Sequence, residues 1–134
     1  MSSRLYRILL AVAALLMAAA TALGAYASHG LDGVLEAGAL RTFETAIDYQ
    51  FFHALGLIGL CIYGQTSPDD RPLALGTLVV TAGTVLFCAG VYVSGLDGPD
   101  AISSLAPAGG VALIAGWLTV AYAVVRRSGR PPQR

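Results

Sequence analysis

The fold is decided by the run LALGTLVVTAGTVLFCAGVYV, from Leu73 to Val93, which contains no charged residue. This run is long enough to cross the hydrocarbon core of a bilayer as an α-helix, which takes about 20 residues. Gly76, Gly83 and Gly90 recur in it at intervals of seven residues, so they share one side of the expected helix. We therefore expect a transmembrane helix with a strip of small residues that lets a neighbouring helix approach closely.

Three further apolar runs lie at about residues 5–27, 47–63 and 105–125. Hydrophobic residues make up 56% of the 134 residues and charged residues only 12%, which excludes a water-soluble globule and a disordered chain. The sequence therefore predicts an all-α membrane protein, a compact antiparallel bundle of four transmembrane helices. The bundle is expected to form a single domain over residues 1–127. Residues 128–134, which include two prolines, are expected to form a disordered cytoplasmic tail.

The second apolar run is the shortest, and a helical pattern continues upstream of it. No proline interrupts the chain between Leu31 and Tyr63. Apolar residues recur there every four positions, and acidic residues lie opposite them, which is typical of an amphipathic helix. The apolar set is Leu35, Ala39, Phe43 and Ile47, and the acidic set is Asp32, Glu36, Glu44 and Asp48. We expect an amphipathic helical segment that leads into the second transmembrane helix.

The arginines predict the orientation of the chain in the membrane. Four crossings place both chain ends and the middle loop on one side, and seven of the eight basic residues lie there, whereas Arg41 lies on the other. The positive-inside rule then predicts a protein of the bacterial cytoplasmic (inner) membrane with both termini in the cytoplasm. A cleavable signal peptide is an alternative for the first run, because Arg4, Arg7 and the small residues before Ser28 also fit one.

In lipid, helices are held together by close packing of small residues and by interhelical hydrogen bonds. Besides the three glycines of the third run, the fourth run offers Gly109, Gly110 and Gly116. The first run offers alanines at helical spacing, namely Ala11, Ala14, Ala18, Ala22 and Ala25. We expect these glycines and alanines to lie at the helix–helix contacts of the bundle.

The densest cluster of polar side chains is expected at or near the outer face, around the start of the second helix. Its members are His29, Arg41, Glu44, Asp48, Tyr49, Gln50 and His53. Spacings of three or four residues put pairs of them, such as Tyr49 and His53, on a common side of a helix. The cluster is either a candidate ligand-binding site or an anchor at the membrane interface.

His53 is the member of this cluster with the strongest claim to a function. It is expected roughly 6–9 Å inside the second helix, where an ionisable side chain must face protein or water. The functional interpretations are a proton relay, a metal ligand or a haem ligand, and the structural one is a neutral imidazole bonded to another helix. A closed interior around its nitrogens would favour the structural role. A polar cavity shared with Asp48 or Glu44 would favour a functional role.

No cofactor, metal or nucleic acid is expected as a partner. His29 and His53 lie at unequal depths for a bis-histidine haem, and two histidines with scattered acids lack the close ligand pair of a zinc site. Cys61 and Cys88 are expected on antiparallel helices, roughly 15 Å apart along the membrane normal, so they form no disulfide. A formal net charge of zero provides no basic field for nucleic acid.

Four motifs, in order along the chain, carry a resemblance to a known family. They are Gly24-Ala25-Tyr26-Ala27-Ser28-His29-Gly30-Leu31, then Tyr49-Gln50-Phe51-Phe52-His53, then Leu86, Phe87 and Tyr92, and finally Pro107, Gly109, Gly110, Gly116 and Trp117. Over nearly its whole length the chain resembles the domain-of-unknown-function 423 family of small inner-membrane proteins, which includes the YgdD and YwdK types. The resemblance lends no mechanism. It weighs against signal cleavage, because the junction of Ala27 and Ser28 lies within a family motif.

Residues suited to packing abound in this sequence, and no catalytic motif such as a phosphate loop or a GxSxG elbow is present. We therefore expect a non-enzymatic protein that contacts the lipid bilayer and acts by association, as a homo-oligomer or as an accessory subunit of a larger membrane complex. The alternative is a small transporter or an ion or proton conductor, with His53, Asp48, Glu44 and the threonines of the third run along a polar path. An enzyme or redox carrier is the third interpretation.

Overall fold

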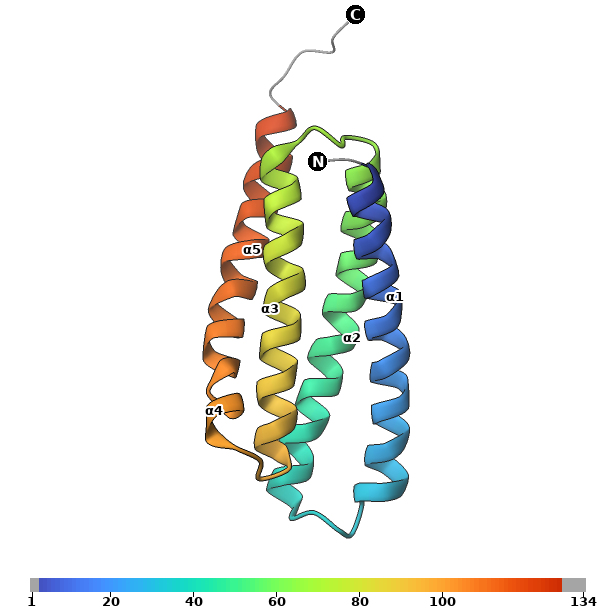
Figure 1. Cartoon of the computed structure of the whole chain (residues 1–134), viewed down its shortest axis with the longest axis vertical. Helices are drawn as coiled ribbons and strands as arrows, with labels where there is room; N and C mark the ends of the chain where they lie inside the picture. Colours follow the sequence, from blue (N-terminus) through green and yellow to red (C-terminus); the bar gives the residue numbers. More distant parts are fainter. Residues whose placement is uncertain (1–2, 129–134) are drawn as a thin grey trace, which may run out of the picture.

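The computed structural model describes residues 3–128 and confirms the predicted bundle of four long apolar helices. The long helices are α1 (Ser3–Tyr26), α2 (Ala37–Gln65), α3 (Arg71–Gly95) and α5 (Leu105–Ser128), and the short α4 (Asp100–Ser103) precedes α5 (Figure 1). A single π-helical turn, η1 (Ala27–Leu31), continues α1. α2 and α3 extend beyond both ends of the apolar runs that predict them, whereas α1 and α5 extend beyond one end only.

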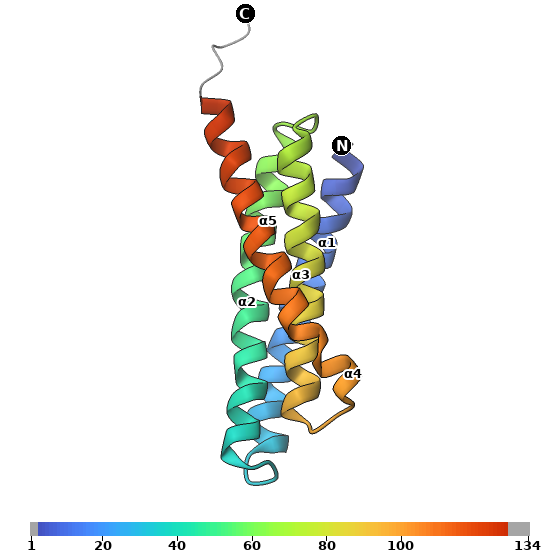
Figure 2. The ribbon, with the colours of Figure 1, turned by 90° about the vertical axis from the view of Figure 1, so that its left-hand side faces the viewer.

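Successive long helices run antiparallel and pack side by side in chain order (Figures 1 and 2). Contacts join α1 to α2, α2 to α3, and α3 to α5, so α1 and α5 lie on opposite sides of the bundle. The first residues of α1 and the last residues of α5 therefore lie at the same end. This end is called the basic end and the opposite one the acidic end.

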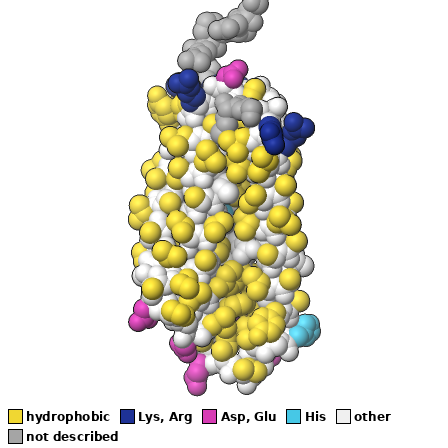
Figure 3. All heavy atoms as spheres, viewed as in Figure 1, with side chains coloured by type: hydrophobic (Ala, Val, Ile, Leu, Met, Phe, Trp, Pro, Cys, Tyr) yellow, Lys and Arg dark blue, Asp and Glu magenta, His cyan; other side chains and the backbone are white. Residues whose placement is uncertain are grey.

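Charged side chains divide between these two ends, as Figure 3 shows for one face of the molecule. The described arginines of the basic end are Arg4, Arg7, Arg71, Arg126 and Arg127, accompanied by Asp69 and Asp70. The residues of the acidic end are Asp32, Glu36, Arg41, Glu44, Asp48, Asp97 and Asp100. The band between the ends is covered largely by apolar side chains, as expected for helices in contact with lipid.

The amphipathic segment predicted before the second transmembrane helix is the first part of α2 itself. The helix begins at Ala37 rather than near Leu31, because the intervening residues form a turn. Gly33 has a φ of 74°, in the left-handed region that a residue without Cβ adopts readily, and Glu36 is extended. Residues 37–65 are then one continuous helix of 29 residues.

The glycines of α3 and α5 lie at the contact between these two helices. A Cβ added to Gly83 would lie 2.9 Å from the backbone nitrogen of Leu113, and one added to Gly116 would lie 2.9 Å from that of Val80. Gly76, Gly90 and Gly109 meet α5 or α3 backbone in the same way. Gly110 has more room, because its nearest neighbour would be the Phe87 ring at 3.7 Å. Backbones that approach this closely gain van der Waals contact along the whole seam.

The face by which α1 packs differs from the one expected from its alanines. Tyr6, Ala13, Ala20 and Ala27, at intervals of seven residues, are buried. The Tyr6 ring fills the space that a side chain on Gly64 of α2 would need. The other alanines, Ala11, Ala14, Ala18, Ala22 and Ala25, are exposed on α1. Both sides of α1 are small and apolar, so spacing alone does not choose between them, and the large Tyr6 and Leu9 side chains fix the buried side.

Ser128, which the sequence assigns to the tail, is the last residue of α5. Residues 129–134, the remainder of the predicted tail, lie outside the described residues.

Candidate functional site

Gln50 is a buried polar residue that joins three helices near the middle of the bundle. Its Nε2 donates a hydrogen bond to the main-chain oxygen of Leu16 in α1, 2.8 Å away. Its Oε1 accepts one from the hydroxyl of Tyr92 in α3, at 2.9 Å. An amide side chain in an apolar interior must find partners of both kinds, because an unpaired donor or acceptor costs about 1–3 kcal/mol. Gln50 thus links α2 to α1 and α3 at the same level.

Apolar and sulfur contacts surround this link. The Tyr92 ring lies against Phe43, with ring centroids 4.8 Å apart, and Cys88 Sγ lies 3.6 Å from the main-chain oxygen of Ala46. Cys61 and Cys88 are both free and buried. The Gln50 amide, the Tyr92 hydroxyl and the Cys88 thiol therefore each have a partner on another helix.

His53 lies near the midpoint of α2, because this helix begins at Ala37 with the amphipathic segment that the sequence predicts. The imidazole neighbours Trp117, whose ring centroid is 6.2 Å away and which lies near the midpoint of α5. Trp117 in turn packs over Gly56, where a Cβ would lie 2.9 Å from the indole. His53 is therefore at the middle of the bundle and not at the outer face.

The imidazole of His53 is bonded within its own helix and borders an apolar cavity. Its Nδ1 lies 2.7 Å from the main-chain oxygen of Tyr49, so Nδ1 carries the proton and Nε2 is the acceptor in the neutral ring. The Tyr49 ring stacks on it, with centroids 5.7 Å apart. Together with Phe87, Gly110, Leu113, Ile114, Trp117 and Leu118, these two residues line a cavity of about 510 Å³. The surroundings are thus neither the closed interior nor the polar cavity considered for His53.

The other members of the predicted cluster lie elsewhere. Glu44 and Asp48 are exposed, and they line a separate cavity of about 260 Å³ together with Gly24 of α1 and Ser28 of η1. Glu44 and His53 are nine residues apart, which is about two and a half turns, so they lie on opposite sides of α2. His29 in η1 and Arg41 near the start of α2 are exposed at the acidic end. The structure therefore divides the cluster into the buried Gln50, the cavity beside His53, and exposed groups of the acidic end.

The threonine hydroxyls of α3 are bonded to main-chain oxygens of their own helix. Thr77 and Thr84 are buried, and their hydroxyls donate to the main-chain oxygens of Leu73 and Val80, both at 2.8 Å. Thr81 bonds to Thr77 in the same way, at 2.8 Å. Hydroxyls bonded to their own helix are satisfied without water. Among residues 3–128, no three His, Cys, Asp or Glu side chains come together as a metal site would require.

Sequence reasoning missed the other side of the His53 cavity. Phe87 lies 4.7 Å from the Tyr49 ring, between centroids, and Leu113, Ile114 and Leu118 come from α5. Gly110 was the available signal for this cavity in the sequence. It belongs to a family motif but is not needed for close packing of α3 and α5, so it leaves space beside the Phe87 ring. The pairing of α2 with α5 across this space could not be read from either helix alone.

Comparisons with known proteins agree with the resemblance carried by the motifs. The family model described as protein of unknown function (DUF423) matches residues 23–110, which include Gln50, His53 and Tyr92. The chain is similar to the UPF0382 membrane protein YwdK of Bacillus subtilis, 30% identical over 92% of this chain and 98% of that protein. It is also similar to the UPF0382 inner membrane protein YgdD of Escherichia coli K12, 28% identical over 94% and 93% of the two chains. No solved structure matches it.

Proposed function

The chain belongs to the DUF423 (UPF0382) family of membrane proteins, and we propose that it acts by association and not by catalysis, with α1 as the contact helix. It is a multi-pass protein of the inner membrane, in contact with lipid. The proposal concerns the surface through which it meets a partner.

The exposed alanines of α1 are the observation that carries this proposal. The alanine face, defined by Ala11, Ala14, Ala18, Ala22 and Ala25, lies away from the buried side of α1. Only 17% of the apolar window of α1 is buried within the bundle, against 44% for α3. Small residues at this spacing let two helices approach closely in lipid, where packing and not the hydrophobic effect drives association.

The occupant we propose for the alanine face is a second copy of this chain. A two-fold axis along the membrane normal brings two α1 helices together with the same residues on both sides, as an isologous contact requires. The alanine face is then complementary to itself, since alanines from each helix fill the spaces between the alanines of the other. Inside the bundle, α3 and α5 already pack in this manner through their glycines.

Disulfide crosslinking in native membranes tests the alanine face. The native Cys61 and Cys88 are buried and are replaced by alanine, and a single cysteine is then introduced at Ala14 or Ala18. We expect a crosslinked dimer on oxidation at either position. Ala115, an exposed alanine near the midpoint of α5, provides the control and should stay monomeric as cysteine. Equal crosslinking at all three positions, or none at any, would contradict the proposal.

For the orientation, we propose that the basic end faces the cytoplasm. The described residues of that end carry five arginines against two acids, while the acidic end carries six acids against Arg41. This asymmetry is the one that directs insertion under the positive-inside rule. A fluorescent reporter that folds only in the cytoplasm, fused behind Arg134, should be bright. A dark fusion, with activity from a periplasmic reporter at the same position, would reverse the assignment.

The cavity beside His53 supports a second candidate, the binding of an apolar membrane-dissolved molecule that carries a hydroxyl. Aromatic walls and one convergent acceptor, His53 Nε2, are the features that hold and orient such a ligand. A proton or ion conductor has less support, because Glu44 and Asp48 lie across α2 from His53 and the threonine hydroxyls are bonded to their own helix. A long-chain alkylphenol should change the fluorescence of Trp117, the single tryptophan, by displacing its surroundings in the cavity, and His53→Leu should weaken this change.

A further inference from the structure

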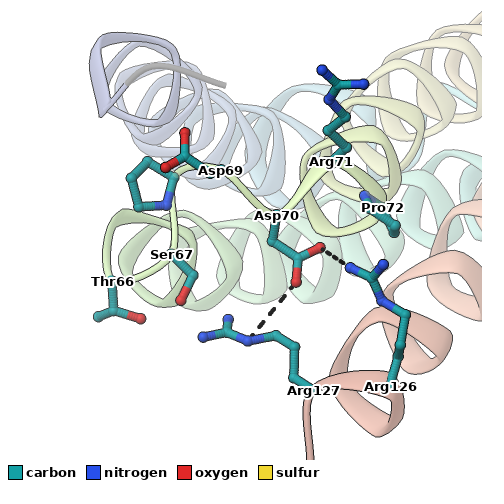
Figure 4. A pocket seen from close by; sticks show the side chains of 9 residues that line it. Thr66, Ser67, Asp69, Asp70, Arg71, Pro72, Arg126 and Arg127 are labelled. Carbon is teal, nitrogen blue, oxygen red and sulfur yellow. Dashed lines mark hydrogen bonds and ion pairs between the residues drawn. The ribbon is translucent and has the colours of Figure 1, made fainter. Parts of the chain in front are cut away.

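At the basic end, the loop between α2 and α3 and the last turn of α5 line an open cavity of about 670 Å³ (Figure 4). Its polar lining includes Thr66, Ser67 and Asp70 from the loop and Arg126 and Arg127 from α5. Asp70 also caps the start of α3, because its Oδ1 accepts a hydrogen bond from the backbone nitrogen of Leu73 at 3.1 Å. The cavity is therefore built on two helix ends that are held in fixed positions.

Asp70 fixes both arginines of α5. Arg126 Nη2 lies 3.3 Å from Asp70 Oδ1, and Arg127 Nε lies 3.8 Å from Asp70 Oδ2. The Asp70 side chain is only 7% exposed, while those of the arginines are 32% and 31% exposed. Figure 4 shows both guanidinium groups directed from α5 towards this carboxylate, and Arg71 pointing away from it. Arg127 also lies 5.3 Å from the centroid of the Tyr63 ring. The two guanidinium groups are thus oriented before any ligand arrives.

One carboxylate does not satisfy two guanidinium groups, which together offer ten N–H donors. The contacts with Asp70 engage Arg126 Nη2 and Arg127 Nε, and both arginine side chains remain about a third exposed. The charged groups that line the cavity are Asp69, Asp70, Arg71, Arg126 and Arg127, so the net charge is positive. Oriented arginine donors with surplus positive charge match the geometry and charge of a phosphate group.

We propose that this cavity binds the phosphate of an anionic phospholipid, with Arg126 and Arg127 as the ligating residues. The position of the site favours a lipid over a soluble phosphate. Immediately below the arginines on α5, Val125 is 73% exposed and Tyr122 is 61% exposed, and on α2 Ile62 is 56% exposed. A phosphate held by the arginines therefore has apolar surface beside it, along which acyl chains can lie. Basic pockets between transmembrane helices bind lipid headgroups in this way.

Retention of phosphatidylglycerol by the full-length protein tests the site. The protein is purified in mild detergent, supplied with micelles containing either phosphatidylglycerol or phosphatidylcholine, and bound lipid is counted by native mass spectrometry. We expect retention of phosphatidylglycerol but not phosphatidylcholine. Replacing both ligating residues, as Arg126→Gln with Arg127→Gln, should weaken retention by about tenfold or more, since the charge-assisted hydrogen bonds of both guanidinium groups to the phosphate are lost.

The matched control removes the same charge from the same end of the bundle. Arg4→Gln with Arg7→Gln alters two exposed arginines of α1 outside the cavity and should change retention less than twofold, the size of a screened long-range effect. Equal losses in the two double variants would overturn the proposal, because the attraction would then be general. If the α5 double variant fails to fold, Arg127→Lys keeps the charge and should still weaken retention, and unchanged retention would overturn the assignment of Arg127.

A competition arm separates a lipid from a soluble source of phosphate. Inorganic phosphate, added in large excess over the lipid, should leave bound phosphatidylglycerol in place, because it lacks the acyl chains that the apolar flank holds. Displacement of the lipid by inorganic phosphate, with the same dependence on Arg126 and Arg127, would assign the cavity to a soluble anion and overturn the lipid proposal.

Discussion

Gln50 Nε2 lies 2.8 Å from the main-chain oxygen of Leu16, and this hydrogen bond ties α2 to α1 in the apolar middle of the bundle. The same amide accepts a hydrogen bond from the Tyr92 hydroxyl of α3. One side chain therefore bonds to two neighbouring helices at once, in addition to the apolar packing among them.

Replacing Gln50 by leucine should destabilise the bundle by about 1–2 kcal/mol. The change keeps the volume roughly constant but removes the bond to Leu16 and leaves the Tyr92 hydroxyl without its acceptor. The free energy of unfolding in detergent, from a titration with sodium dodecyl sulfate, measures the effect. Gln65→Leu is the control, because the hydrogen bond of Gln65, at 3.4 Å to the Cys61 oxygen, lies within its own helix. Equal losses from the two substitutions would show that Gln50 has no special role.

A methyl group added at Gly83 should separate α3 from α5. The new Cβ would lie 2.9 Å from the Leu113 nitrogen, and backbone at this distance yields only if the helices move apart. We expect Gly83→Ala to cost about 1–3 kcal/mol in the same titration, as overpacking does. Gly59→Ala, at an exposed helical site with no atom within 4 Å, should be neutral or stabilising. The prediction fails if Gly83→Ala is as well tolerated as Gly59→Ala.

The neutral ring of His53 should carry its proton on Nδ1. The Tyr49 main-chain oxygen, 2.7 Å away, can only accept a hydrogen bond, so the Nδ1–H tautomer is selected. Nitrogen chemical shifts of protein labelled at histidine, recorded at neutral pH, distinguish the two tautomers. His29, which is exposed, provides an internal reference for an unconstrained ring. A dominant Nε2–H form at His53 would contradict the bond and remove the acceptor from the cavity.

Two substitutions at Asp70 should separate the contribution of its helix cap to stability from the contribution of its ion pairs. Asp70→Asn keeps an oxygen that can cap Leu73 but loses the charge, so only the part-exposed ion pairs with Arg126 and Arg127 are weakened, at about 0–1 kcal/mol. Asp70→Ala removes the cap as well and should cost about 1 kcal/mol more. Thermal unfolding at low and high salt measures both effects. If asparagine and alanine were equally destabilising, the cap would contribute nothing.

The four apolar runs predict the fold because length and composition suffice to identify helices that cross a bilayer. Boundaries were harder to predict where a helix leaves the apolar region. The first turns of α2 carry Arg41, Glu44 and Asp48 on an exposed face, so hydropathy alone did not show at which residue this helix begins. The turn around Gly33, in contrast, depends on local backbone geometry that the spacing of Leu35 and Ala39 did not reveal.

The partners of the candidate site residues could not be predicted, because they come from segments that are distant in the sequence. Gln50 belonged to the predicted cluster, but its partners Leu16 and Tyr92 follow only from the packing of three helices. Asp70 and Arg126 are 56 positions apart, and they meet because the start of α3 and the end of α5 lie at the same end of the bundle. The four-helix topology predicts this shared end, but it does not predict which charged residues form ion pairs there. For α1, two strips of alanine were equally suited to packing, and the bulk of Tyr6 against Gly64 decided between them.

The central claim is that two copies of this chain associate through the alanine face of α1, and the mass of the purified protein in mild detergent tests it most directly. Light scattering should give a protein mass twice that of the 13.8 kDa chain, falling to that of a single chain when Ala14 and Ala18 are both replaced by leucine. Ala115→Leu on α5 should leave the mass unchanged. A single-chain mass for the wild type at every concentration, or a dimer that persists in the Ala14→Leu and Ala18→Leu variant, would contradict it.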